Sequence, residues 1–269
     1  MNFLVDLIMK TILDTLYLTG MIILVGFILG FLRDQSMGNF QRSFGFKAVA
    51  VTAVIGVPIH EMSHAIFCLI FGHKIKKMVL LQKRDENGVL GYVSHAYNPN
   101  SVYQQAGNFF IGIAPIFGGI STIIALMYIM IPKTYNEFIN ISLNNLNVTK
   151  ISQGAIEVIL NSYINLIKII FSTKNFGNPY FILFLFLAIC ISAHISLSTA
   201  DIKGASKGLL IIFLLILVVN VFGFSRFVMA ESILKYNIVL IGFLIVSLIF
   251  SSITYLVSLL LSLIKSNII

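Results

Sequence analysis

Two histidines and a glutamate stand at a spacing that can bind a divalent metal and use it. His60 and His64 are four residues apart, so on a helix both imidazoles lie on one face and can bind one ion together. Glu61 follows the first histidine, where its carboxylate can reach a water on the metal instead of the metal itself. Zinc lowers the pKa of such a water, and the glutamate can take its proton as the oxygen attacks a carbonyl. This HExxH pattern therefore predicts hydrolytic zinc chemistry.

A third ligand must come from elsewhere, because catalytic zinc normally has three protein ligands and an open position. The metzincin extension needs a histidine at position 70, which is Ile70, and His73 is a poor candidate because it lies near the membrane interface. Asp201 is the better candidate. His194 lies seven residues before it, two helical turns away, and the two side chains therefore share a face of any helix there.

These assignments leave alternatives open. Asp201 could instead be an interfacial acid paired with Lys203 or Lys207. His194 could stabilise an oxyanion, orient a neighbouring group, replace Asp201 as ligand, or simply be a hydrogen-bonded structural histidine. In lipid, two histidines and a glutamate cost several kcal/mol unless they are paired, bind an ion or face water. The motif could therefore also be a polar patch satisfied by neighbouring helices.

The composition requires a membrane as solvent for most of the chain. Of 269 residues 58% are hydrophobic and 10% are charged, and the mean hydropathy is +0.97. A soluble domain is about 25% charged, so a water-soluble enzyme and a disordered chain are both excluded. The net charge is +8, but the basic residues flank apolar runs. We therefore expect contacts with lipid headgroups and no nucleic-acid partner. Cys68 and Cys190 are predicted to be small buried hydrophobes without a disulfide.

The fold class expected is an all-α polytopic membrane protein with about six transmembrane helices and a membrane-proximal β-hairpin. A span takes about 20 mostly apolar residues. The predicted spans are 16–32, 47–72, 107–131, 180–198, 209–224 and 238–264. His64 then lies roughly 12 Å inside the end of the second span at 1.5 Å per residue. Because spans alternate in direction, the fourth span ends on the same side, so Asp201 can reach a similar depth if the fourth helix is broken or continues past Ser198.

The chain is expected to be a single integral membrane domain, 1–269, with a catalytic core of about 48–207. Within loop 73–106, apolar runs around an Asn-Gly pair predict a hairpin. Loop 132–179 is Asn-rich at first and then has helical spacing, which favours a helix lying in the interface. Helices five and six occupy 208–264.

The motif residues resemble the site-2 protease family of intramembrane zinc metalloproteases. Those enzymes carry HExxH in one helix, continued to a glycine and a short β region, as in the stretch from His60 to Gly72 here. Their third ligand is an aspartate in a later helix, commonly followed directly by glycine and preceded by asparagine and proline. Asp201 resembles that element, with His194 before it, although Gly204 comes three residues later and no proline is present. The Gly- and Pro-containing run 108–119 also resembles their third helix.

The resemblance implies an intramembrane zinc endopeptidase that hydrolyses peptide bonds of membrane-associated substrates. His60, His64 and Asp201 would hold Zn²⁺, Glu61 would act as base and proton donor, and His194 would assist catalysis. The resemblance also implies a membrane-protein or membrane-associated peptide substrate. The composition adds the lipid bilayer as a partner, and its richness in Ile and Asn is typical of a multi-pass protein of a prokaryotic plasma membrane. We expect either a regulatory membrane partner or shedding of the substrate by another protease to set the timing. Two alternatives are a non-catalytic scaffold or immunity-type protein and a metal or proton transporter.

Overall fold

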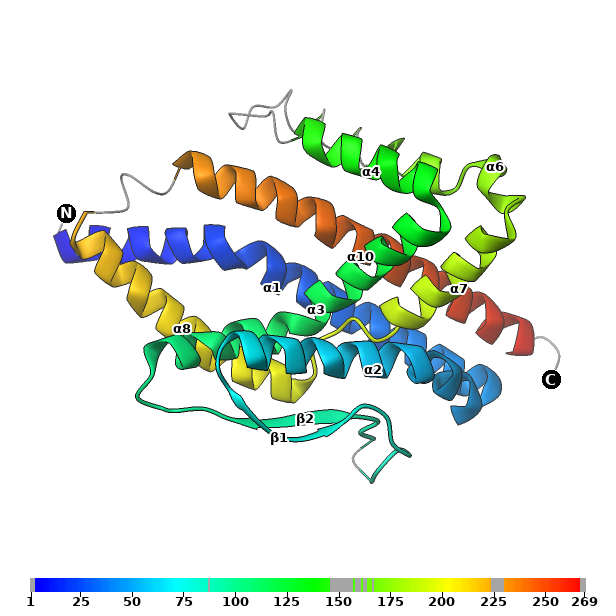
Figure 1. The fold of residues 1–269 in the computed structure, drawn as a ribbon, viewed down its shortest axis with the longest axis horizontal. Coiled ribbons are helices and arrows are strands. Elements are labelled where there is room, and N and C mark those ends of the chain that lie inside the picture. Colours follow the sequence, from blue (N-terminus) through cyan, green and yellow to red (C-terminus); the bar gives the residue numbers. More distant parts are fainter. Residues whose placement is uncertain are drawn as a thin grey trace. The chain divides into compact units, whose positions relative to one another are not determined.

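The described part of the chain is mostly helical and contains one small hairpin (Figure 1). The computed structural model describes residues 3–86, 88–145, 157, 161, 164, 165, 167–223 and 230–266. The helices are α1 (Phe3–Phe44), α2 (Phe46–Ile70), α3 (Val102–Met130), α4 (Pro132–Asn145), α6 (Thr173–Phe176), α7 (Pro179–Ser192), α8 (Thr199–Val221) and α10 (Ala230–Ser266). The antiparallel strands are β1 (Lys74–Val79) and β2 (Tyr92–Ala96). The predicted helical class with a hairpin is confirmed.

Within the described residues, five helices are long and apolar enough to cross a membrane: α1, α2, α3, α8 and residues 240–266 of α10. They make the chain an integral multi-pass membrane protein. The predicted fourth span differs, because α7 ends at Ser192 after 14 residues. At 1.5 Å per residue it is about 21 Å long, which is less than the hydrocarbon core of about 30 Å. An apolar run predicts burial, but it does not predict that the helix is unbroken.

Two helix ends lie well outside the predicted spans. Helix α8 begins at Thr199, ten residues before the predicted fifth span, and α1 runs on to Phe44, twelve residues beyond the first. Hydropathy detects only the apolar part of a helix, whereas the backbone hydrogen bonds continue through polar turns. Helix α4 also occupies a stretch that was expected to be loop. The interfacial helix expected over 151–166 lies mostly outside the described residues.

The chain divides into two compact units. One comprises Met1–Val25, Ile124–Phe184 and Leu210–Val246, and the other comprises Gly26–Ile123, Leu185–Leu209 and Ser247–Ile269. The second unit contains the hairpin and every predicted site residue. Its strands pair antiparallel with Ile75 opposite His95, and one irregularity falls between Ile75 and Lys77. The hairpin lies alongside α2 (Figure 1).

The end of α2 is a hydrogen-bonded turn that only glycine fits well. The N–H of His73 donates to the carbonyl of Cys68 at 2.8 Å, and the N–H of Gly72 donates to that of Leu69 at 3.1 Å. This pair of bonds is the Schellman motif, whose residue after the helix adopts a left-handed conformation. Gly72 has φ +69, as the motif requires. The turn satisfies the last carbonyls of α2 and leads directly into β1.

Candidate metal centre

Three predicted ligands meet inside the second unit. The Nε2 atoms of His60 and His64 are 3.2 Å apart, and Nε2 of His64 lies 3.2 Å from Oδ1 of Asp201. Nε2 of His60 lies 3.8 Å from the other carboxylate oxygen. The two histidines come from consecutive turns of α2 and the aspartate from the first turn of α8. Residues 137 positions apart in the chain therefore form one cluster of ligand atoms.

Two backbone carbonyls hold the imidazole rings in place. Nδ1 of His64 donates to the carbonyl of Ile111 in α3 at 2.8 Å. Nδ1 of His60 donates to the carbonyl of His194, in the segment between α7 and α8, at 2.9 Å. A carbonyl can only accept, so both protons of the neutral rings lie on Nδ1. The lone pairs on Nε2 then face the cluster, which is the usual orientation of metal-binding histidines.

The arrangement fits a zinc ion. Tetrahedral zinc with bonds of about 2.0 Å sets neighbouring ligand atoms about 3.3 Å apart, close to the two shortest separations here. Two bare ring nitrogens and a carboxylate would repel one another unless a positive charge, a proton or a metal ion, lies between them. The donor set of two imidazoles and one carboxylate is also that of known catalytic zinc sites.

Asp201 is placed by the start of its own helix. The N–H of Ser198 donates to Oδ2 of Asp201 at 2.7 Å, and the N–H of Asp201 donates to Oγ of Ser198 at 3.1 Å. These reciprocal bonds form a capping box of the Ser-x-x-Asp type. The box fixes where α8 begins and leaves Oδ1 of the aspartate directed toward His64. Sequence reasoning missed this signal, although the four residues from Ser198 to Asp201 contain it.

Glycines on α3 allow the ligand-bearing segments to approach closely. A Cβ at Gly112 would lie 2.6 Å from the backbone oxygen of Asp201, and one at Gly118 would overlap the side chain of Ser63. At Gly119, a Cβ would overlap Ile195. These glycines therefore let helices pack closely, as small residues do in membranes. Helix α3 thus contacts α2, α8 and the segment between α7 and α8 at the level of the ligands.

The structure places Glu61 and His194 beside the three ligands but outside their cluster. Glu61 lies next to His60 on α2 and is buried, with 7% of its surface exposed. The His194 ring is also buried, and its Nε2 is 3.2 Å from Oγ1 of Thr52. Gly56 leaves the space for this ring, because a Cβ there would overlap it. The carbonyl of His194, and not its ring, contacts a ligand.

The catalytic roles of Glu61 and His194 stay predictions. A further residue, Ile111, was missed because it acts through its backbone, which no pattern of side chains reveals.

Residues 53–149 match the family described as "Putative zincin peptidase". The matched stretch contains the HExxH motif, the hairpin and α3, and it ends before Asp201. It supports a zinc metallopeptidase relationship for this part of the chain. Comparison with curated proteins and with solved structures gives no match.

Proposed function

We propose that this protein is an intramembrane zinc endopeptidase of the site-2 protease type. The observation that carries the proposal is the convergence of His60, His64 and Asp201 from two apolar helices, with both rings turned toward the carboxylate. The match to a zinc peptidase family supports the same chemistry. The location of all three ligands on helices that can span a membrane supports cleavage within the bilayer.

Each residue has a distinct role in this proposal. His60, His64 and Asp201 would hold zinc, which supplies Lewis-acid chemistry by lowering the pKa of a water molecule and polarising the scissile carbonyl. Glu61, buried beside His60, takes the proton of the attacking water and passes it to the leaving amine. His194 is a positioning residue, because its carbonyl orients the ring of His60 while its own ring is held by Thr52.

Water and substrate need access to these buried groups. The side chains of His60 and Asp201 are 15% and 13% exposed, so the cluster is not completely sealed. A substrate helix must unwind before hydrolysis, since its peptide bonds are otherwise hydrogen-bonded and shielded. The hairpin formed by β1 and β2 lies alongside the HExxH helix and offers a strand edge to the unwound segment. The substrate class is therefore an extended segment of a membrane-associated protein, and timing would depend on a separate membrane partner.

The test replaces Glu61 with glutamine, which keeps the shape but removes the base. We expect Glu61→Gln to abolish cleavage of single-span reporter proteins in proteoliposomes while zinc stays bound. Glu137→Gln is the matched control, because Glu137 is exposed on α4 and is not part of the site. Cleavage by Glu61→Gln at the wild-type rate would refute the assignment. Bound zinc without proteolysis by the wild type would favour the non-catalytic alternative.

A further inference from the structure

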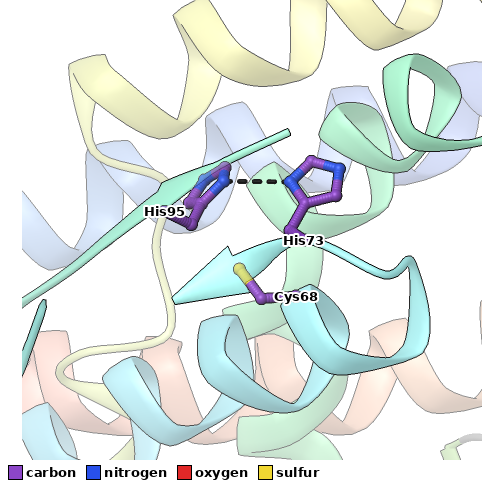
Figure 2. Close-up of side chains that lie close together, drawn as sticks. All are labelled: Cys68, His73 and His95. Atoms are coloured by element: carbon purple, nitrogen blue, oxygen red, sulfur yellow. Dashed lines mark hydrogen bonds between the residues drawn. The ribbon is translucent and has the colours of Figure 1, made fainter. Parts of the chain in front are cut away.

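A second group of metal-ligating side chains lies at the end of the HExxH helix. The ligand atoms of Cys68, His73 and His95 all lie within 4.8 Å of one another. Figure 2 shows the Cys68 sulfur directed toward the two imidazole rings, which face each other. Cys68 is fully buried, His73 is buried and His95 is partly exposed. None of these residues belongs to the candidate centre described above.

The Schellman turn brings the first two of these residues together. In that motif the sixth residue donates its N–H to the carbonyl of the first, and here these residues are His73 and Cys68. The same two positions commonly share a side-chain contact, which is hydrophobic in most helices. In this chain they carry a thiol and an imidazole instead. Gly72 between them supplies the positive φ that makes the turn possible.

The ring of His73 is held as a ligand would be. Its Nε2 donates to the backbone carbonyl of Gln104 at 2.8 Å, so the neutral ring has its lone pair on Nδ1. The side-chain amide of Gln104 donates to the carbonyl of Gly72 and accepts from the N–H of Asn98. These two bonds connect Gln104, and with it the backbone carbonyl that holds His73, to the residues just before and just after the hairpin. A backbone carbonyl on the far nitrogen is the arrangement typical of metal-binding histidines, and His60 and His64 show it too.

The pairing of the two strands places the third residue, His95, beside His73. His95 in β2 pairs with Ile75 in β1, and its Nδ1 lies 2.9 Å from Nδ1 of His73. The register of the hairpin thus brings a third ligand atom to the cluster.

We propose that Cys68 Sγ, His73 Nδ1 and His95 Nδ1 form a second zinc site. A thiolate and two imidazoles select zinc over Mg²⁺ or Ca²⁺, which prefer oxygen ligands. Tetrahedral zinc needs the two ring nitrogens about 3.3 Å apart, so the rings need to separate by only a few tenths of an ångström. Binding releases the thiol proton of Cys68, and the proton between the two rings moves to Nε2 of His95. The fourth position is left to water.

This site would join the HExxH helix to the hairpin. Cys68 is one helical turn beyond His64, about 6 Å along α2, and His95 lies in the second strand. An ion held by both therefore fixes β2 relative to the turn that carries His64. The inference stands on the ligand geometry alone and does not require that the protein is a peptidase.

The experiment measures metal on the full-length protein in detergent. We expect two zinc ions per chain for the wild type. After exchange with Co²⁺, a thiolate-to-cobalt charge-transfer band should appear, because this site contains sulfur. The cluster of His60, His64 and Asp201 contains none, so cobalt there cannot give this band. The band therefore reports on Cys68 independently of the first centre.

Three variants separate the possible outcomes. Cys68→Ala should lose the band and one zinc, whereas Cys190→Ala, at the other buried cysteine, should keep both. Asp201→Asn should lose the other zinc and keep the band. Wild-type protein with one zinc and no band would overturn the proposal and leave a hydrogen-bonded histidine pair. A band that survives in Cys68→Ala would overturn it as well, even if that variant folds poorly.

Discussion

Asp201 serves two purposes at the scale of single residues. Oδ2 of its carboxylate caps the start of α8 by accepting a hydrogen bond from the backbone N–H of Ser198, while Oδ1 faces Nε2 of His64. The side chain is therefore fixed before any metal binds, which lowers the entropy lost on coordination. Ser198 contributes only to the cap. The two roles can be separated experimentally, because one depends on a charge and the other on a hydrogen bond.

Asp201→Asn should remove a zinc ligand and keep the cap. Asparagine still accepts the N–H of Ser198 through its amide oxygen, but it lacks the negative charge that zinc favours. Loss of groups that merely orient ligands costs about 10–100-fold in affinity, so loss of a ligand should cost more than about 100-fold. Zinc titration against a chelator of known affinity measures this change.

Ser198→Ala is the matched control for this prediction. It removes the hydroxyl that bonds the N–H of Asp201 and should lower the free energy of unfolding by about 1 kcal/mol. Zinc content should stay at the wild-type level. Zinc affinity in Asp201→Asn equal to that of the wild type would show that the carboxylate is not a ligand.

Helix α3 sets the spacing of the ligand helices at the scale of elements. Ile111 orients His64 of α2, and the next residue, Gly112, lies against the backbone of Asp201 in α8. A side chain at the glycine position would push α8 away from α2. The distance between the two ligand-bearing helices therefore depends on the absence of a single methyl group.

Gly112→Ala should weaken zinc binding and stability together. The added Cβ would meet the oxygen of Asp201 at 2.6 Å and the Cβ of Ala205 at 2.8 Å. Overpacking of this kind costs about 1–3 kcal/mol. Thermal unfolding and zinc content of the same preparation test both effects.

Gly204→Ala on α8 supplies the comparison for this prediction. A Cβ there meets nothing within 4 Å, so this variant should be about 0.4–1 kcal/mol more stable with its zinc retained. Equal behaviour of the two variants would contradict a role for close packing at Gly112.

Much of the arrangement of elements could be predicted from the sequence. The apolar runs gave the membrane class, and the HExxH spacing correctly paired His60 with His64. The hairpin followed from apolar strands around a turn. The break between α7 and α8 could not be derived from hydropathy, because Ala193, Ile195 and Leu197 continue the apolar run of the helix before them. The capping pattern that begins at Ser198 was the local signal for it.

Contacts made by the backbone, or between residues far apart in the chain, could not be predicted from the sequence. The carbonyl of Ile111 has no signature, since every residue has a carbonyl. Cys68 was predicted to be only a buried hydrophobe, because cysteine metal sites usually show a second cysteine nearby in the sequence and Cys68 has none. Its neighbours His73 and His95 are brought to it by a helix-ending turn and by strand register. Both features require the three-dimensional fold.

At the scale of the whole molecule, the two compact units should respond differently to mutation. The metal-ligating clusters found among the described residues lie in the second unit. The first unit has its own buried polar contact, in which Asn220 donates to Thr11 at 3.1 Å and to Asp14 at 3.0 Å. This contact ties α8 to α1 within that unit and has no ligand role.

Asn220→Ala should therefore lower stability without changing zinc content. Hydrogen bonds between helices in membranes contribute about 0.6 kcal/mol on average and up to about 1.7, so a loss of about 1–2 kcal/mol is expected for the two bonds. Val218→Ala, at an exposed position of the same helix, should have little effect. Unfolding in mixed detergent micelles gives the stability, and metal analysis gives the zinc. Loss of zinc from Asn220→Ala would contradict the expectation that the two units respond independently to mutation.

The interruption between α7 and α8 frees a carbonyl and an N–H that an unbroken helix would pair with each other. In an unbroken helix the carbonyl of His194 would accept the N–H of Ser198, four residues later. Here the carbonyl accepts from Nδ1 of His60 and from the N–H of Ser196, and the N–H of Ser198 donates to Asp201. This carbonyl and this N–H, which would pair with each other in an unbroken helix, therefore each align one of the proposed zinc ligands. Restoring helicity at this point would consequently misalign both ligands at once, even though it would improve the local backbone.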